Sequence, residues 1–109
     1  MASIKNVLII NLEDHGGPVY AGRPKGEKVR KKYDLDKLDF EQTNVKIIIP
    51  DDTYTINSSF FLGMLGQSIR NAGTKEIFLE SFTFDSPELF DSKINDYIDR
   101  ALHERKPLF

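Results

Sequence analysis

Two serines at the predicted start of a helix are the residues of this chain best placed to do chemistry. Val45 to Ile49 is a β-branched run of strand length, which a proline and two aspartates end. A polar loop then leads to Asn57-Ser58-Ser59, a sequence typical of a helix N-terminus. Unpaired backbone N–H groups and aligned peptide dipoles make such a terminus attractive to anions. We therefore expect Ser58 and Ser59 to lie where a phosphate can be bound or carried.

The predicted working surface combines this helix start, the loop before it and two upstream arginines. Its members are the phosphorylation candidates Ser59 and Ser58, with Asp52, Thr53, Asn57, Phe60, Arg23 and Arg30 as further partner- or anion-binding candidates. Residues 23–32 hold six basic side chains against one acid, Glu27. The simpler interpretations are helix capping by Asn57-Ser58-Ser59 and a solvated helix face for the basic stretch.

Aromatic residues flank the two serines, and core packing is the default expectation for Tyr54, Phe60 and Phe61. Phe60 becomes a candidate partner anchor if it is exposed beside Ser59, because aromatic residues concentrate at interface hot spots.

A second group of polar residues follows two predicted strands. Glu13, Asp14 and His15 come after the first strand, and Asp51 and Asp52 come after Val45 to Ile49. Ligands of open α/β sheets gather past the carboxyl ends of strands, so a metal or acid–base site is one alternative. Acids at strand ends are more often turn formers, and we predict no catalytic residue, metal or cofactor. His103 is expected to interact with the dipole of the last helix.

Apolar runs and turn signals alternate along the chain. They predict strands at 7–12, 19–21, 45–49 and 75–80, the last extending to residue 84 at most, and helices at about 26–33, 58–71 and 86–104. Residues 34–43 are either a helix end with a loop or a broken turn. This order predicts an α/β fold with a small four-stranded, mostly parallel or mixed sheet and about three helices. The length of 109 residues predicts a single domain, 1–109.

Composition narrows the classes of protein that remain. Hydrophobic residues at 39% and charged residues at 29% are ordinary globular values. The absence of cysteine excludes disulfides and thiolate chemistry. No apolar run approaches membrane-spanning length and no signal peptide is evident, so we expect a cytoplasmic protein. The net charge is −2 and the chain has no aromatic stacking motif, so nucleic acid is the least expected of the possible binding partners.

Two motifs resemble those of STAS domains, which include the bacterial anti-sigma-factor antagonists. In that family a strand is followed by Asp-Ser-Ser-Gly at a helix start and then by a Leu-Gly pair. Asn57-Ser58-Ser59-Phe60 stands in that place here, with Leu62-Gly63 and Leu65-Gly66 behind it. Gly26-Glu27-Lys28-Val29-Arg30 is similar to a helix start in STAS-like domains of unknown function. The resemblance covers about residues 18–73.

The resemblance implies a non-enzymatic signalling domain that binds another protein. In partner-switching STAS proteins the second serine is phosphorylated by a kinase-like ATPase that is also the binding partner, and by position that serine is Ser59. Asn57 and Phe60 stand where the family has aspartate and glycine. The alternatives are a nucleotide- or anion-binding domain using the same helix start with Arg23 or Arg30, and an enzyme using Asp14, His15, Asp51 and Asp52.

Overall fold

The structure, a computed structural model, describes residues 7–41 and 43–103 and has a mixed α/β fold, as the sequence predicts. Its strands are β1 (Val7–Asn11), β2 (Val19–Tyr20), β3 (Asn44–Ile48), β4 (Thr55–Ile56) and β5 (Phe82–Asp85). Its helices are α1 (Arg23–Lys32), α2 (Leu35–Glu41), α3 (Ser58–Ala72), α4 (Lys75–Ser81) and α5 (Asp91–His103). Two short 3-10 helices, η1 (Leu12–His15) and η2 (Glu88–Phe90), precede β2 and α5.

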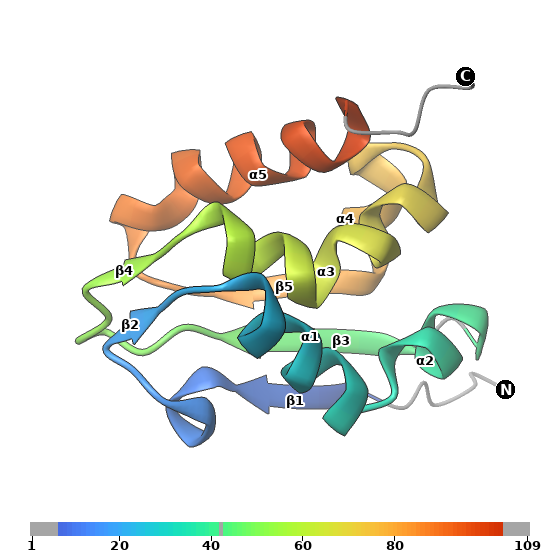
Figure 1. Cartoon of the computed structure of the whole chain (residues 1–109). Coiled ribbons are helices and arrows are strands. Elements are labelled where there is room, and N and C mark those ends of the chain that lie inside the picture. Colours follow the sequence, from blue (N-terminus) through green and yellow to red (C-terminus); the bar gives the residue numbers. More distant parts are fainter. Residues whose placement is uncertain (1–6, 42, 104–109) are drawn as a thin grey trace, which may run out of the picture.

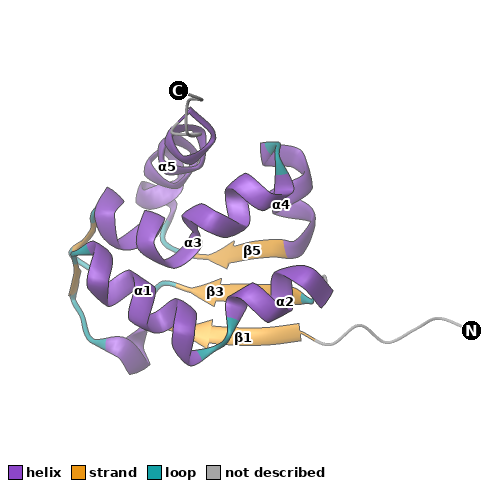
Figure 2. Ribbon diagram, turned by 45° about the vertical axis from the view of Figure 1, so that its right-hand side comes forward, coloured by secondary structure: helices purple, strands orange, loops and turns teal. Residues whose placement is uncertain are grey.

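The main sheet is parallel, with β3 between β1 and β5 (Figure 1). Because side chains alternate along a strand, Ile10 and Ile47 point toward the helices, where both are fully buried. Val7 and Ile9 alternate with them and are each 55% exposed. The helices lie on one side of this sheet (Figure 2). The described residues therefore form two layers and leave one face of the sheet uncovered.

A second, two-stranded sheet pairs β2 with β4, also in parallel. Each of these strands leads directly into a helix, β2 into α1 and β4 into α3. The pairing continues into the start of α3, because the Asn57 backbone N–H donates to the Tyr20 carbonyl at 3.0 Å. The small sheet thus brings the first turns of α1 and α3 to the same end of the molecule (Figure 1).

Glycine lets these two helices approach closely. A Cβ atom at Gly26 of α1 would meet the Phe60 carbonyl oxygen, and one at Gly63 of α3 would lie 2.5 Å from the Arg23 carbonyl oxygen. Contact of this kind needs a residue without a side chain, because the obstructing atoms belong to the backbone.

The core is built around α3, whose residues 60–66 are all buried. Aromatic rings join it to the sheet and to α5: Phe61 stacks on Phe84 at 5.9 Å and packs on Tyr97 at 5.2 Å between ring centroids. The Tyr97 hydroxyl also donates to the Ile56 carbonyl at 2.7 Å. These contacts hold α5 against the beginning of α3.

The predicted strand at 75–80 is wrong, because these residues form α4. Thr74 caps this helix by accepting from the Ile77 N–H at 3.1 Å, and the strand begins only at Phe82. The apolar residues Ile77 and Leu79 are 51% and 38% exposed, whereas Phe78 is buried. The Phe78 ring stacks on the Phe82 ring with 4.6 Å between centroids. The helical conformation of this segment therefore buries Phe78 and leaves its apolar neighbours partly in solvent.

Other element boundaries also differ from the prediction. Within the described residues there are five strands in two sheets and five α-helices, instead of four strands and about three helices. Residues 35–41 form the separate helix α2, which follows Asp34 with its positive φ of 53°. Asp tolerates this left-handed conformation, which interrupts the path of α1. The predicted last helix is divided into η2 and α5.

Candidate functional site

The start of α3 has the capped geometry that the sequence predicts. The Asn57 side-chain oxygen Oδ1 accepts from the Phe60 N–H at 3.1 Å, and the Asn57 carbonyl accepts from the Phe61 N–H at 3.2 Å. Asn57 itself is exposed. The first N–H groups of a helix have no partner within the helix, so this end retains donors that can meet an anion.

Ser58 and Ser59 are both half-buried at this helix end. The Ser58 hydroxyl accepts a hydrogen bond from Arg100 Nη1 at 3.0 Å. Among the described residues, no side-chain hydrogen bond involves Ser59. Sequence reasoning missed Arg100, which lies 42 positions away and reaches the site only because α5 packs on α3.

The aromatic residues near the serines divide between core and surface. The core prediction is confirmed for Phe60 and Phe61, which are each 1% exposed. Phe60 packs on Tyr20, with 5.5 Å between ring centroids, and so cannot serve as a surface anchor. The core prediction is wrong for Tyr54, which is 80% exposed. Tyr54 precedes β4, where its backbone N–H donates to the Pro18 carbonyl at 2.8 Å and its side chain remains outside the core.

The loop residues before α3 also lie in different environments. Thr53 is only 8% exposed, so it is removed from the surface that was expected to meet a partner. Asp52 is exposed, and its charge helps raise the pKa of the buried Tyr20 hydroxyl, although burial is the larger cause. The Tyr20 hydroxyl donates to the Leu12 carbonyl at 3.0 Å, which ties β2 to η1.

Arg30 lies away from the α3 start and cannot bind an anion there. It is 9% exposed, and its guanidinium donates to Asp36 Oδ1 at 2.7 Å and Asp39 Oδ2 at 2.9 Å. It also donates to the Met64 carbonyl at 3.0 Å and the Ser68 hydroxyl at 2.9 Å. Arg30 therefore links α1, α2 and α3. Arg23, in contrast, is exposed at the first turn of α1.

The sequence offers the polar residues that follow β1 and β3 as an alternative metal or acid–base site. His15 Nε2 lies 2.6 Å from the Tyr33 hydroxyl, its only side-chain hydrogen bond within the described residues. Across residues 7–41 and 43–103, no three histidine, aspartate or glutamate side chains are grouped as metal ligands would be. His103 Nδ1 lies 2.8 Å from the Asp99 carbonyl in the last turn of α5. This is the helix end whose dipole His103 is expected to meet.

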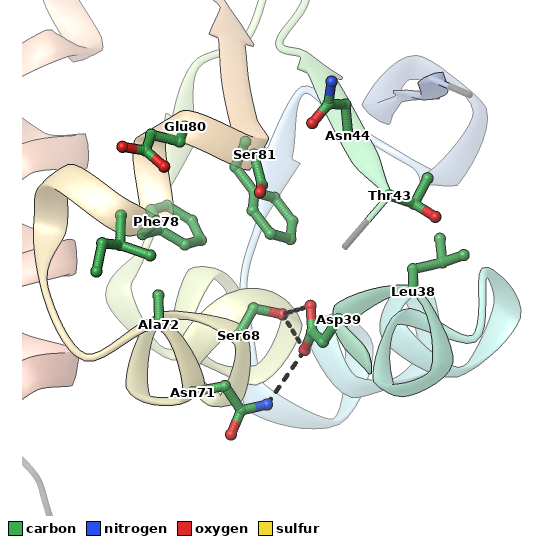
Figure 3. A pocket seen from close by; sticks show the side chains of 12 residues that line it. Leu38, Asp39, Thr43, Asn44, Ser68, Asn71, Ala72, Phe78, Glu80 and Ser81 are labelled. Carbon is green, nitrogen blue, oxygen red and sulfur yellow. Dashed lines mark hydrogen bonds between the residues drawn. The ribbon is translucent and has the colours of Figure 1, made fainter. Parts of the chain in front are cut away.

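A polar cavity of about 310 Å³ opens between α2, α3, α4 and the first residues of β3 and β5 (Figure 3). Ser68 and Asp39 lie on one side of it, and Phe78 and Ser81 lie opposite (Figure 3). The Ser68 hydroxyl donates to Asp39 at 2.8 Å, and Asp39 also pairs with Arg30. The Asp39 carboxylate is thus already neutralised and hydrogen-bonded, as expected for a structural cluster.

No helix within the described residues is long and apolar enough to span a bilayer. No protein-family model, curated protein or solved structure matches the chain, and the similarity to STAS-like domains therefore stays a prediction.

Proposed function

We propose that this chain is a STAS-like regulatory domain that acts by binding another protein at the start of α3. One observation carries the proposal: the Ser58 hydroxyl, at a helix N-terminus, is held by the Arg100 guanidinium at 3.0 Å. A cation and the positive end of a helix here flank a group that can be phosphorylated. The exposed Tyr54 ring, on the loop that leads to this helix, supplies apolar area for a partner.

Phosphorylation would change this surface in a way that depends on the serine modified. A phosphate on Ser58 would pair with Arg100 through charge-assisted hydrogen bonds, which are stronger than the neutral bond it replaces. Ser59 is the position that the STAS resemblance favours, and a phosphate there would add about two negative charges beside the same helix end. Either modification would switch docking by charge, with a kinase-like ATPase as the expected partner and enzyme.

Site-specific photo-crosslinking tests the docking surface. A photoreactive phenylalanine analogue replaces Tyr54 in one variant and Phe40, which is 89% exposed on α2, in a matched control. We expect a discrete covalent adduct in cells from position 54 and none of the same mass from position 40. Identical adducts from both positions, or none from position 54, would contradict docking at this corner.

The phospho-switch is tested on the partner that the crosslink identifies. We expect Ser58→Asp or Ser59→Asp to change its affinity at least about tenfold, because a charge enters the interface. Ser92→Asp, an exposed position on α5, is the control for added charge elsewhere. Unchanged affinity in both serine variants would exclude the switch and leave only docking.

A nucleotide- or anion-binding domain is the second candidate. The observation that favours it is the run of exposed basic side chains along α1, beginning with Arg23. Stabilisation of the isolated chain by ATP or GTP in a thermal-shift measurement, with no protein partner present, would favour this function.

A further inference from the structure

Helix α1 has a charge pattern that opposes its own stability. Its first turn contains no acid and no side-chain cap, and Arg23 and Lys25 lie there at the positive end of the helix dipole. Lys25, Lys28 and Lys32 are three and four positions apart, so they share one face and repel one another. A helix that lacks a cap, a favourable charge in its first turn and favourable charge spacing departs from several sequence preferences at once. Such departures are expected at functional sites.

These three lysines line a groove instead of a flat surface. His15 of η1 faces them, and Val29, which is 5% exposed, lies between them. The groove has a volume of about 330 Å³, within the range of small-molecule sites.

The positive charge of the groove is not neutralised within the described part of the chain. No aspartate or glutamate there lies within 4.0 Å of the Lys25, Lys28 or Lys32 ammonium nitrogen. Glu27 is on a different side of α1, by the rotation of about 100° per residue. The acids of η1 are Glu13 and Asp14, and the Asp14 charge acts on the Tyr33 hydroxyl, whose pKa burial and Asp14 together raise.

The histidine wall of the groove is held in position. His15 Nε2 is 2.6 Å from the Tyr33 hydroxyl, and the two rings meet edge to face with centroids 5.4 Å apart. Tyr33 is the residue that ends α1, so the same contact ties η1 to the end of the lysine face. This gives the groove a second side, opposite the lysines, that a hydrogen bond and a ring contact hold in place.

We propose that this groove binds a small molecule with a chain of two or more phosphate groups. The three ammonium groups are distributed over about 10 Å of helix axis, which suits a linear polyanion better than a single anion. Lysine acts as a point charge toward phosphate. Binding would also remove the repulsion among the lysines, a gain that a neutral ligand cannot provide. The site is separate from the α3 start, so it does not rest on the protein-binding function; it deepens the second candidate, anion binding by the basic side chains of α1, and rests on it.

Calorimetry of the full chain with tripolyphosphate tests the proposal. We expect saturable binding that weakens as salt is added, because exposed charges are screened. Lys28→Glu should weaken it at least about tenfold, since it reverses the central charge of the groove. The matched control is Lys31→Glu, the same change on an exposed side of α1 that does not line the groove, with an effect within about twofold.

The melting temperature of the free protein separates a lost site from lost folding. Lys28→Glu places an acid four positions before Lys32, a favourable helical pair, so Tm should be unchanged or about 2 °C higher. Loss of binding in a protein of unchanged or raised Tm supports the site. Equal weakening by Lys28→Glu and Lys31→Glu, or no saturable binding by the unaltered chain at low salt, would overturn it.

ATP and an acidic peptide identify what the groove recognises. Binding of ATP equal to that of tripolyphosphate indicates a free phosphate chain, and tighter binding of ATP indicates a nucleotide, and both support the site. Binding of ATP without any binding of tripolyphosphate would overturn it, because the base would then carry recognition. A glutamate-rich peptide that binds more tightly than tripolyphosphate would overturn it in favour of an acidic protein partner.

Discussion

At the scale of single residues, Arg30 decides how the first half of the chain is organised. Its guanidinium uses all three nitrogens, donating to two carboxylates, a hydroxyl and a backbone carbonyl. The two carboxylates differ, since the Asp39 side chain is 9% exposed and the Asp36 side chain is 78% exposed. Removing one partner of a buried ion pair leaves an uncompensated charge, whereas an exposed pair contributes little.

We expect Asp39→Asn to lower the free energy of unfolding by at least about 2 kcal/mol, because Arg30 then lacks its buried counter-charge. Asp36→Asn should cost less than about 1 kcal/mol. Urea denaturation followed by circular dichroism measures both values. Equal losses in the two variants would show that burial does not distinguish the two pairs.

At the scale of elements, the contact between α1 and α3 sets the position of the serine-bearing helix end. Intrinsic helix propensity alone would predict that alanine stabilises any helical glycine by about 1 kcal/mol. Tertiary contacts change that prediction at Gly26, where a Cβ atom would meet backbone atoms of Phe60 and Met64. At Gly66 the nearest atom is 3.3 Å away, at the flexible end of Arg70.

Gly26→Ala and Gly66→Ala should therefore differ in their effect on stability. We expect Gly26→Ala to cost about 1–3 kcal/mol, because overpacking forces the helices apart. Gly66→Ala should be neutral or stabilise by up to about 1 kcal/mol. Chemical denaturation provides both free energies of unfolding, and a stabilising effect of Gly26→Ala would refute the close helix contact.

At the scale of the whole molecule, the residues that the structure describes cover the main sheet on one face only, which is uncommon for parallel sheets. The uncovered face mixes apolar and polar residues, since Val7 lies beside Asn44 and Ile9 beside Lys46. The opposite face, which includes Ile10, belongs to the core. Neighbouring isoleucines on β1 thus lie in different environments.

Ile10→Ala and Ile9→Ala measure this difference. Ile10 is fully buried, so its truncation should cost about 2–5 kcal/mol through lost burial and a cavity. Ile9, at 55% exposed, should cost less than about 1 kcal/mol. Thermal and urea unfolding measure the free energy lost in each variant. Equal losses in the two variants would show that the face carrying Ile9 is covered in solution.

Alkaline pH should destabilise the molecule through three tyrosines that are fully or partly buried. Burial raises the pKa of Tyr20, Tyr33 and Tyr97 above the ordinary value of 10.0. The folded state then holds these protons more tightly than the unfolded state, so their contribution is complete below pH 10 and is lost as pH rises through the folded pKa values.

The free energy of unfolding should accordingly fall above pH 10, and less steeply in Tyr97→Phe. Tyrosinate absorbance in the folded protein provides the direct measurement. Ionisation of all four tyrosines at the ordinary value would contradict the effect of burial.

Local sequence predicted the parts of this protein that depend on near neighbours. The strands β1 and β3, the Asn57 cap and the extent of α3 follow from an apolar run, a turn and a capping side chain. These features were predictable because the interactions that fix them span only a few residues. The predicted strand at 75–80 failed for the opposite reason, since a short apolar segment fits either conformation until Phe78 meets Phe82.

By itself, the sequence determined an α/β chain with a capped helix start that carries two hydroxyls, and a basic segment upstream. Only the tertiary structure decided that Arg30 is buried, that Arg100 reaches Ser58, and that three lysines meet His15 across a groove. The physical reason is that the sequence gives the type of each side chain directly, whereas the direction and the partners of a side chain depend on packing between elements far apart along the chain.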